Sequence, residues 1–351
     1  MARRSTAELA EESAPLLHPK LTEHLMAHVP VEKQLLTMLI AKRLPHALLL
    51  TGPRGIGKAT LAWRLARFLL APQDKGDSLF GESLPPESLY ISATHPTFRR
   101  MAAGAHPDFL VLEAEDIKID EARSVAAFLS LTPAESDWRV VIIDSIDAMN
   151  RNAANALLKT LEEPPARAVL ILISHNPGTL LPTIRSRCRT LRVPPLNESE
   201  FAHILERVSP GHTPQQAESW ALLSGGSPGM ALTLIEARAD ILYKELLERV
   251  TAPDTLKSHA FADRFARKDA AGDWQVFCHL FLWLMLRVVS PQHHAQVFAE
   301  EGDALARLRK AKSLDAWLDL KDRAAKLLTD TDHLYLDKKQ TILTLLRAAG
   351  E

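Results

Sequence analysis

The chain has 351 residues, enough for about two to three domains, and 46% of them are hydrophobic, which excludes an intrinsically disordered protein. Its 42 Lys and Arg residues balance 43 Asp and Glu residues, and the resulting net charge of −1 excludes nucleic-acid binding through an overall excess of positive charge. Cys188 and Cys278 are the two cysteines, too few for a disulfide framework or a four-cysteine zinc site.

The N-terminal residues and the most apolar stretch of the chain bear on targeting and membrane insertion. Residues 1–20 start basic but are interrupted by three glutamates, so we expect a flexible tail and no signal peptide. The most apolar stretch, residues 276–289, is shorter than the roughly 20 residues that a membrane-spanning helix needs. It is predicted to be a buried core helix, and the chain to be cytoplasmic with no membrane partner.

Short apolar runs alternate with helical patterns in the first half of the chain. This alternation predicts a parallel sheet covered by helices, and the continuous hydrophobicity of the runs predicts strands buried on both faces. The predicted strands are 47–50, 109–112, 140–143 and 169–173, and the predicted helices are 58–70, 119–131 and 153–161. Residues 71–106 are rich in turn residues and are predicted to form a surface insertion.

Beyond residue 195 the strand pattern stops and the sequence is helical in character. The predicted fold class is therefore α/β, with a parallel-sheet core followed by helical domains. A Gly-Gly-Ser-Pro-Gly break at 225–229 supports a division into a core at 21–195, a small helical domain at 196–240 and a larger one at 241–351.

A phosphate-binding loop follows the first predicted strand directly and precedes a helix. In such a loop the glycine amides wrap the phosphates, and the lysine reaches the β and γ phosphates. We expect ATP or ADP to bind here, through Gly52, Gly55, Gly57, Lys58, Ala59 and Thr60.

Two departures weaken the predicted ATPase chemistry. Ala59 stands where Ser or Thr would hold Mg²⁺, and Thr60 is turned about 100° further around the helix. Asp144 ends the third predicted strand, where a P-loop ATPase carries an acid that holds the Mg²⁺ shell. Ser145 follows it in place of a glutamate that would orient water, and Asp147 is a poor substitute. Phosphate binding is expected to survive, with Mg²⁺ placement weakened and hydrolysis slow or absent.

Longer sequence strings carry a family resemblance. Asn155-Ala-Leu-Leu-Lys-Thr-Leu-Glu-Glu-Pro-Pro165 and Ile184-Arg-Ser-Arg-Cys188 resemble the clamp-loader branch of the AAA+ ATPases. His106-Pro-Asp108, Arg151-Asn-Ala-Ala-Asn155 and Gly226-Ser-Pro-Gly229 resemble the delta-prime subunits of bacterial DNA polymerase III, and the motifs span about residues 44–231. The resemblance implies an AAA+ core, a helical lid and a helical collar that oligomerises.

The resemblance also implies partners and residue roles. The expected partners are the tau/gamma motor subunits and the delta subunit, the sliding clamp, and primed DNA reached through the assembled ring. Arg187, flanked by Arg185 and Arg189, corresponds to the arginine finger that such subunits present to ATP on a neighbour. Lys159 corresponds to a DNA-proximal position.

Further family features are altered or ambiguous in this chain. The sensor 1 position falls at Ser174 or His175, with Ser174 as the candidate. The lid turn Gly225–Met230 offers no cation to act as a sensor arginine, and no cysteine precedes residue 188, so no zinc module is expected.

Three functions are compatible with these residues. The principal expectation is a largely non-catalytic ring member that supplies Arg187 during clamp loading in DNA replication. The alternative is an active AAA+ motor that hydrolyses ATP at its own loop, and a P-loop kinase is disfavoured because the helical third has no catalytic motif. His24 and His28 have metal-ligand spacing but no third ligand, so they are predicted to be surface histidines.

Overall fold

The computed structural model describes residues 18–72, 86–113, 117–265, 271–290 and 295–350. The chain divides into two compact units, Met1–Glu200 and Phe201–Glu351. The predicted tail at 1–20 lies outside the described residues except for its last three. The predicted division of the helical part at residue 240 stays a prediction.

A five-stranded parallel sheet forms the centre of the first unit, in the order β2-β3-β4-β1-β5. All four predicted strands are present, and a fifth was missed because it is short and carries one buried apolar residue, Leu191. The strands are β1 (Ala47–Thr51), β2 (Phe109–Glu113), β3 (Arg139–Asp144), β4 (Ala168–Ser174) and β5 (Arg189–Arg192).

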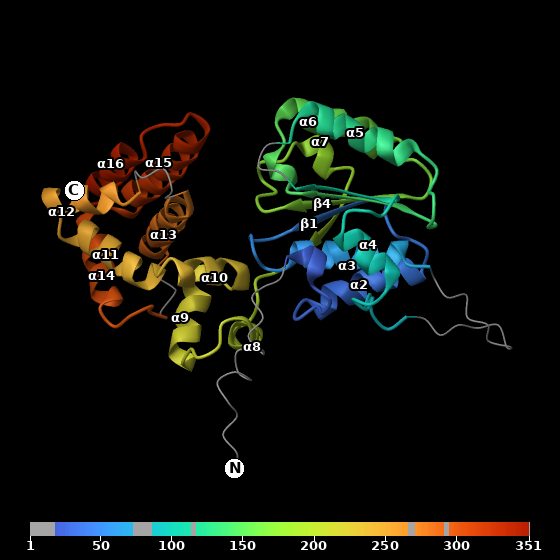
Figure 1. Cartoon of the computed structure of the whole chain (residues 1–351). Coiled ribbons are helices and arrows are strands. Elements are labelled where there is room, and N and C mark those ends of the chain that lie inside the picture. Colours follow the sequence, from blue (N-terminus) through green and yellow to red (C-terminus); the bar gives the residue numbers. More distant parts are fainter. Residues whose placement is uncertain (1–17, 73–85, 114–116, 266–270, 291–294, 351) are drawn as a thin grey trace, which may run out of the picture. The chain divides into compact units, whose positions relative to one another are not determined.

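Helices cover both faces of this sheet, as Figure 1 shows. Alternate residues of β1 point to opposite faces: Leu48 and Leu50 pack into a core with α3, and Leu49 packs into a core with α5 and α6. The helices are α2 (Val29–Ile40), α3 (Lys58–Leu70), α4 (Pro96–Ala102), α5 (Ile119–Ser130), α6 (Arg151–Glu162) and α7 (Pro182–Arg185), with short 3-10 turns η1 (Pro19–Leu21) and η2 (Ile146–Ala148).

Burial of the strands follows their place in the sheet. The residues of β1 and β4 are buried throughout, as are those of β3 except its last, which agrees with the predicted burial on both faces. The prediction was wrong for β2, whose residues are half-buried or exposed. The reason is its position at the edge of the sheet, where neighbours cover it incompletely.

The predicted surface insertion at 71–106 is only partly correct. Residues 73–85 lie outside the described part of the chain. Further along, Leu89, Phe98 and Met101 are buried, and the last two lie on the short helix α4. A helix of seven residues is too short to show a clear apolar period, which is why the sequence pattern did not reveal it.

Two arginines on α3 fasten the start of the described chain. Arg67 is buried and donates hydrogen bonds to the carbonyl oxygens of Pro19, Lys20 and Thr22. Arg64 forms a buried ion pair with Glu32 of α2 at 2.7 Å. The Arg67 bonds hold the segment before α2 against α3, and the Arg64 ion pair holds α2 itself against α3.

The second unit is entirely helical in its described residues, as predicted. Its central helix, α13, buries the apolar stretch that the sequence indicated, including Phe277, Phe281 and Leu284. Within the described ranges, no helix is both long and apolar enough to cross a membrane. The helices are α8 (Glu198–Val208, which starts in the first unit), α9 (Pro214–Ser224), α10 (Pro228–Glu236), α11 (Ala239–Thr251), α12 (Thr255–Asp263), α13 (Ala271–Val289), α14 (Glu301–Ala311), α15 (Leu314–His333) and α16 (Lys338–Gly350).

Candidate functional site

The phosphate-binding loop connects β1 to α3 and depends on its glycines. Gly52 has φ +153°, and a Cβ atom there would lie 2.2 Å from the carbonyl oxygen of Val193, so a larger residue cannot fit. Gly55 (φ +78°) and Gly57 (φ +102°) also have left-handed backbones, which glycine adopts readily. The local geometry therefore explains three of the predicted loop residues.

Lys58 is folded into its own loop. Its side chain is 3% exposed, and Nζ donates hydrogen bonds to the carbonyl oxygens of Gly52 at 2.6 Å and Pro53 at 2.5 Å. Burial lowers the pKa of Lys58 to about 8. A phosphate bound in this loop would have to compete with those two carbonyl oxygens for the ammonium group.

The first turn of α3 lacks the expected metal-binding hydroxyl. Ala59 packs its methyl group against the core between the sheet and α3. Thr60, the next residue, is half-buried. In the described residues, no group of three His, Cys, Asp or Glu side chains is arranged to hold a metal ion.

Asp144 ends β3 close to the loop. Burial raises the pKa of its carboxyl group and Glu113, its register partner on β2, adds to this effect, whereas the charge of Lys58 opposes it. The charges of Asp144 and Lys58 each affect the other group's pKa, so the end of β3 and the loop are near enough to interact electrostatically.

Asp147 has a structural role that the sequence did not reveal. Its carboxylate accepts hydrogen bonds from the Ser174 hydroxyl at 2.8 Å, the His175 amide at 2.5 Å and the Ser145 hydroxyl at 3.2 Å. The residue after Asp144 is therefore a hydroxyl donor that is itself bonded to Asp147. Asp147 therefore connects the turn after β3 to the end of β4, and Ser145 contributes a hydrogen bond within that turn.

The two sensor 1 candidates differ in their surroundings. Ser174 is fully buried, and its hydroxyl is bonded to Asp147. His175 is half-buried, and its Nδ1 has no hydrogen-bond partner within the described residues. Burial lowers the pKa of His175 to about 4, and the nearby charge of Lys58 adds to the effect, so the ring is neutral at pH 7. The choice of Ser174 stays a prediction.

Arg187 lies between α7 and β5, with its side chain 35% exposed. Its guanidinium forms an ion pair with Glu162 of α6 at 2.7 Å and also donates to the carbonyl oxygen of Thr183 at 3.0 Å. Lys159 is exposed on the same helix, one turn before Glu162. Two of the motifs that carry the family resemblance, at 155–165 and 184–188, thus meet at one surface of the first unit.

His28 was wrongly predicted to lie on the surface. It is 5% exposed, and its Nε2 lies 2.6 Å from the carbonyl oxygen of Ile56 in the phosphate-binding loop. Burial lowers its pKa. A single histidine carries no sequence signal for a partner 28 residues away, so only the fold could reveal this contact.

Asp108 explains the His-Pro-Asp motif. Its buried carboxylate accepts hydrogen bonds from the amides of Ala134, Glu135 and Ser136, and Arg139 lies 3.6 Å away. The motif fixes the loop between α5 and β3 and contributes no reactive group to the nucleotide site.

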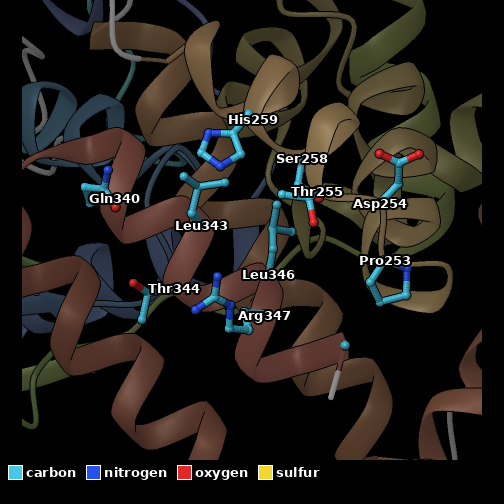
Figure 2. Close-up of a pocket in the computed structure, with 11 residues that line it drawn as sticks. Pro253, Asp254, Thr255, Ser258, His259, Gln340, Leu343, Thr344, Leu346 and Arg347 are labelled. Atoms are coloured by element: carbon cyan, nitrogen blue, oxygen red, sulfur yellow. The ribbon is translucent and has the colours of Figure 1, made fainter.

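A pocket of about 490 Å³ lies in the second unit, between α12 and α16 (Figure 2). Leu343 and Leu346 line it together with polar side chains that include His259 and Arg347. All of its lining residues belong to the second unit.

Comparison with known proteins identifies the family. A family model described as "DNA polymerase III, delta subunit" matches residues 28–197. A DNA polymerase III subunit delta' from Pseudomonas aeruginosa is 35% identical over 309 residues, which are 85% of this chain and 86% of that protein. The chain belongs to the DNA polymerase III delta-prime family.

The chain is also similar to other DNA polymerase III subunits and to a solved structure. The delta' subunit of Escherichia coli is 35% identical over 54% of each chain, and the tau subunit of the same organism is 29% identical over 55% of this chain and 29% of that protein. A gamma subunit-related protein from Thermotoga maritima has a solved structure with 20% identity and a TM-score of 0.42, covering 90% of this chain and 98% of that one. The delta-prime protein has the predicted parallel-sheet core, followed by helices in its described residues.

Proposed function

We propose that this delta-prime protein serves in a clamp loader as a ring member that promotes ATP hydrolysis on a neighbouring subunit and hydrolyses little ATP itself. The relatives named as delta', gamma and tau subunits of DNA polymerase III support membership of such an assembly. The finer partners proposed are a tau or gamma motor, the delta subunit, the sliding clamp and primed DNA, in a cytoplasmic complex.

The hydrogen bonds that the Asp147 carboxylate accepts are the observation that supports weak ATP hydrolysis by this chain. Hydrolysis needs a group that orients the attacking water. Ser145 replaces the expected glutamate, and Asp147, the next acid along the chain, is bonded to Ser174 and to the His175 amide. A carboxylate that already accepts these hydrogen bonds is poorly placed to serve as a base.

Nucleotide binding itself is compatible with the loop. Gly52, Gly55 and Gly57 keep the required backbone, and Lys58 is charged at pH 7 because its pKa is about 8. We propose that ATP or ADP occupies the loop with weak Mg²⁺ placement, because Ala59 offers no hydroxyl. The nucleotide would then stabilise the subunit more than it would serve as a substrate.

Arg187 is proposed as the finger that acts in trans. A guanidinium stays charged at all relevant pH values and can donate two parallel hydrogen bonds to phosphate oxygens, which stabilises charge in the transition state. Arg187 is partly exposed at the end of α7, where a neighbouring subunit can reach it. Lys159, exposed on α6, is proposed to approach the DNA backbone.

The test is hydrolysis by the reconstituted ring with clamp and primed DNA. Arg187→Ala should slow ATP hydrolysis about 10³-fold or more at the one site that Arg187 serves. In a single-turnover measurement, the burst of hydrolysed ATP should then be smaller by the share of that site. Arg189→Ala, which removes an exposed arginine of β5, is the matched control and should leave the burst unchanged. An intact burst with Arg187→Ala would show that the finger role is wrong.

The alternative is an active motor that uses its own loop. It predicts rapid ATP turnover by the isolated chain, abolished by Lys58→Ala. Our proposal predicts slow or no turnover by the isolated chain and a ring burst that Lys58→Ala leaves largely intact.

A further inference from the structure

The ion pair between Glu162 and Arg187 joins two of the family motifs in the first unit, those at 155–165 and 184–188. Glu162 ends α6 within the string Leu-Glu-Glu-Pro-Pro, and Arg187 belongs to Ser-Arg-Cys before β5. Their side chains are 49% and 35% exposed, and 2.7 Å separates Glu162 Oε1 from Arg187 Nη2. Neither side chain is needed to fill the core, so packing alone does not account for the contact.

The second terminal nitrogen of the guanidinium is also engaged within the chain. Nη1 donates to the carbonyl oxygen of Thr183 at 3.0 Å and to the hydroxyl of Ser186 at 3.2 Å. A guanidinium recognises phosphate through parallel N–H groups of its fork. Three of the five guanidinium N–H groups therefore have acceptors within the chain, and a phosphate that binds the terminal fork competes with Glu162 for Nη2.

We propose that Glu162 is a latch that holds the arginine finger in the free subunit and competes with the neighbour's nucleotide for it. On assembly, phosphate oxygens replace the Glu162 carboxylate as acceptors of the Arg187 N–H groups. The inference rests on the proposed role of Arg187 as a finger and adds a residue that controls how readily the finger is released.

The exposure of the pair sets the size of the effect. Partly exposed ion pairs change an equilibrium by a factor of up to about five, because water screens the charges and both long side chains lose freedom. Such a latch favours the conformation in which Arg187 is paired with Glu162. It is weak enough for a multiply charged phosphate group to displace.

The chain offers a matched control next to the latch. Glu163 is exposed and follows Glu162 directly, so Glu163→Gln removes the same charge from the same helix end without touching the ion pair. Glu162→Gln preserves the shape of the side chain and removes its negative charge. Circular dichroism of both variants checks that the helical content is unchanged.

The first test measures the accessibility of Arg187 in the isolated full chain. Phenylglyoxal modifies guanidinium groups, and peptide mass spectrometry follows the rate at Arg187. We expect Arg187 to react about two to five times faster in Glu162→Gln than in wild type, with Glu163→Gln equal to wild type. Equal rates in all three proteins would overturn the latch.

The second test measures ATP hydrolysis by the ring without clamp or DNA. Glu162→Gln should raise the basal rate at the one site that Arg187 serves about two- to fivefold over Glu163→Gln, seen as a rise in the corresponding fraction of the ring's hydrolysis. A fall would overturn the latch by showing that Glu162 positions the finger productively. If Arg187→Ala lowers hydrolysis and Glu162→Gln has no effect, only the latch is wrong, whereas no effect of Arg187→Ala would refute the finger role itself.

Discussion

The Oδ1 atom of Asp147 lies 2.8 Å from the hydroxyl of Ser174, and this bond joins the turn after β3 to the end of β4. The same carboxylate accepts a hydrogen bond from the His175 amide. An acid at this position of a P-loop ATPase would be expected to take part in catalysis. Here it stabilises the carboxyl ends of two central strands, beside the loop where the nucleotide is proposed to bind.

The first prediction concerns this stabilisation. Asp147→Ala should lower the free energy of unfolding by about 1–3 kcal/mol, because the Ser174 hydroxyl and the His175 amide lose their acceptor. Urea denaturation of the full chain measures the change. Asp137→Ala, which removes an exposed ion pair with Arg167 at 3.6 Å, should change stability by less than about 0.5 kcal/mol. Equal losses in the two variants would contradict the role given to Asp147.

Asp108 leads to a prediction about pH. Burial by itself raises the pKa of Asp108, but the hydrogen bonds from Ala134, Glu135 and Ser136 outweigh it, so the pKa lies below its ordinary value. A lowered folded pKa means that this stabilisation is fully present above the unfolded value of about 3.9 and is lost as the pH falls through the folded value.

Asp108→Asn should therefore destabilise the chain by about 3 kcal/mol at neutral pH, since it also leaves the buried Arg139 without its carboxylate. The difference from wild type should stay constant from about pH 8 to about pH 5 and shrink below about pH 4. Denaturation across this range measures it, with exposed Asp120→Asn as the control. A difference that grows on acidification would refute the sign of the shift.

Lys58 should make nucleotide affinity depend on pH. With a pKa of about 8, roughly nine-tenths of the nucleotide-free chain carries a charged Lys58 at pH 7 and one-tenth does so at pH 9. If only the charged form binds phosphate, ADP should bind about tenfold more weakly at pH 9 than at pH 7. Calorimetric titration tests this expectation. Lys58→Ala should bind weakly with a flat profile, and exposed Lys33→Ala should follow wild type.

The second unit contains a buried charge network that can be tested separately. Glu301 is fully buried, accepts a hydrogen bond from Tyr243 at 2.7 Å and pairs with Arg287 at 3.3 Å. Glu301→Ala should destabilise this unit by about 3–5 kcal/mol, because a buried guanidinium loses its counter-charge. Hydrogen exchange of α13 and α14 reports on this unit directly. Glu300→Ala, which breaks an exposed pair with Lys244, should leave the exchange unchanged.

Local patterns in the sequence were sufficient for much of the fold. Continuous apolar runs predicted β1, β3 and β4 because both faces of a central strand are buried, and the period of α3 matched its observed bounds, Lys58–Leu70. The absence of a hydroxyl at Ala59 and of a carboxylate at Ser145 is known from the sequence alone, because it depends only on the residue type. These features, with the longer motif strings, were enough to indicate the family.

Tertiary structure alone decided which polar groups meet. The bonds from Asp147 to Ser174, from His28 to Ile56 and from Glu162 to Arg187 each join residues that lie far apart in the chain. No local period encodes such pairs, because they depend on where separate strands and helices end in space. The sequence by itself therefore determined the class of the phosphate-binding loop and the groups that it lacks. The fold determined that Asp147 joins the ends of β3 and β4 and that Arg187 forms an ion pair with Glu162.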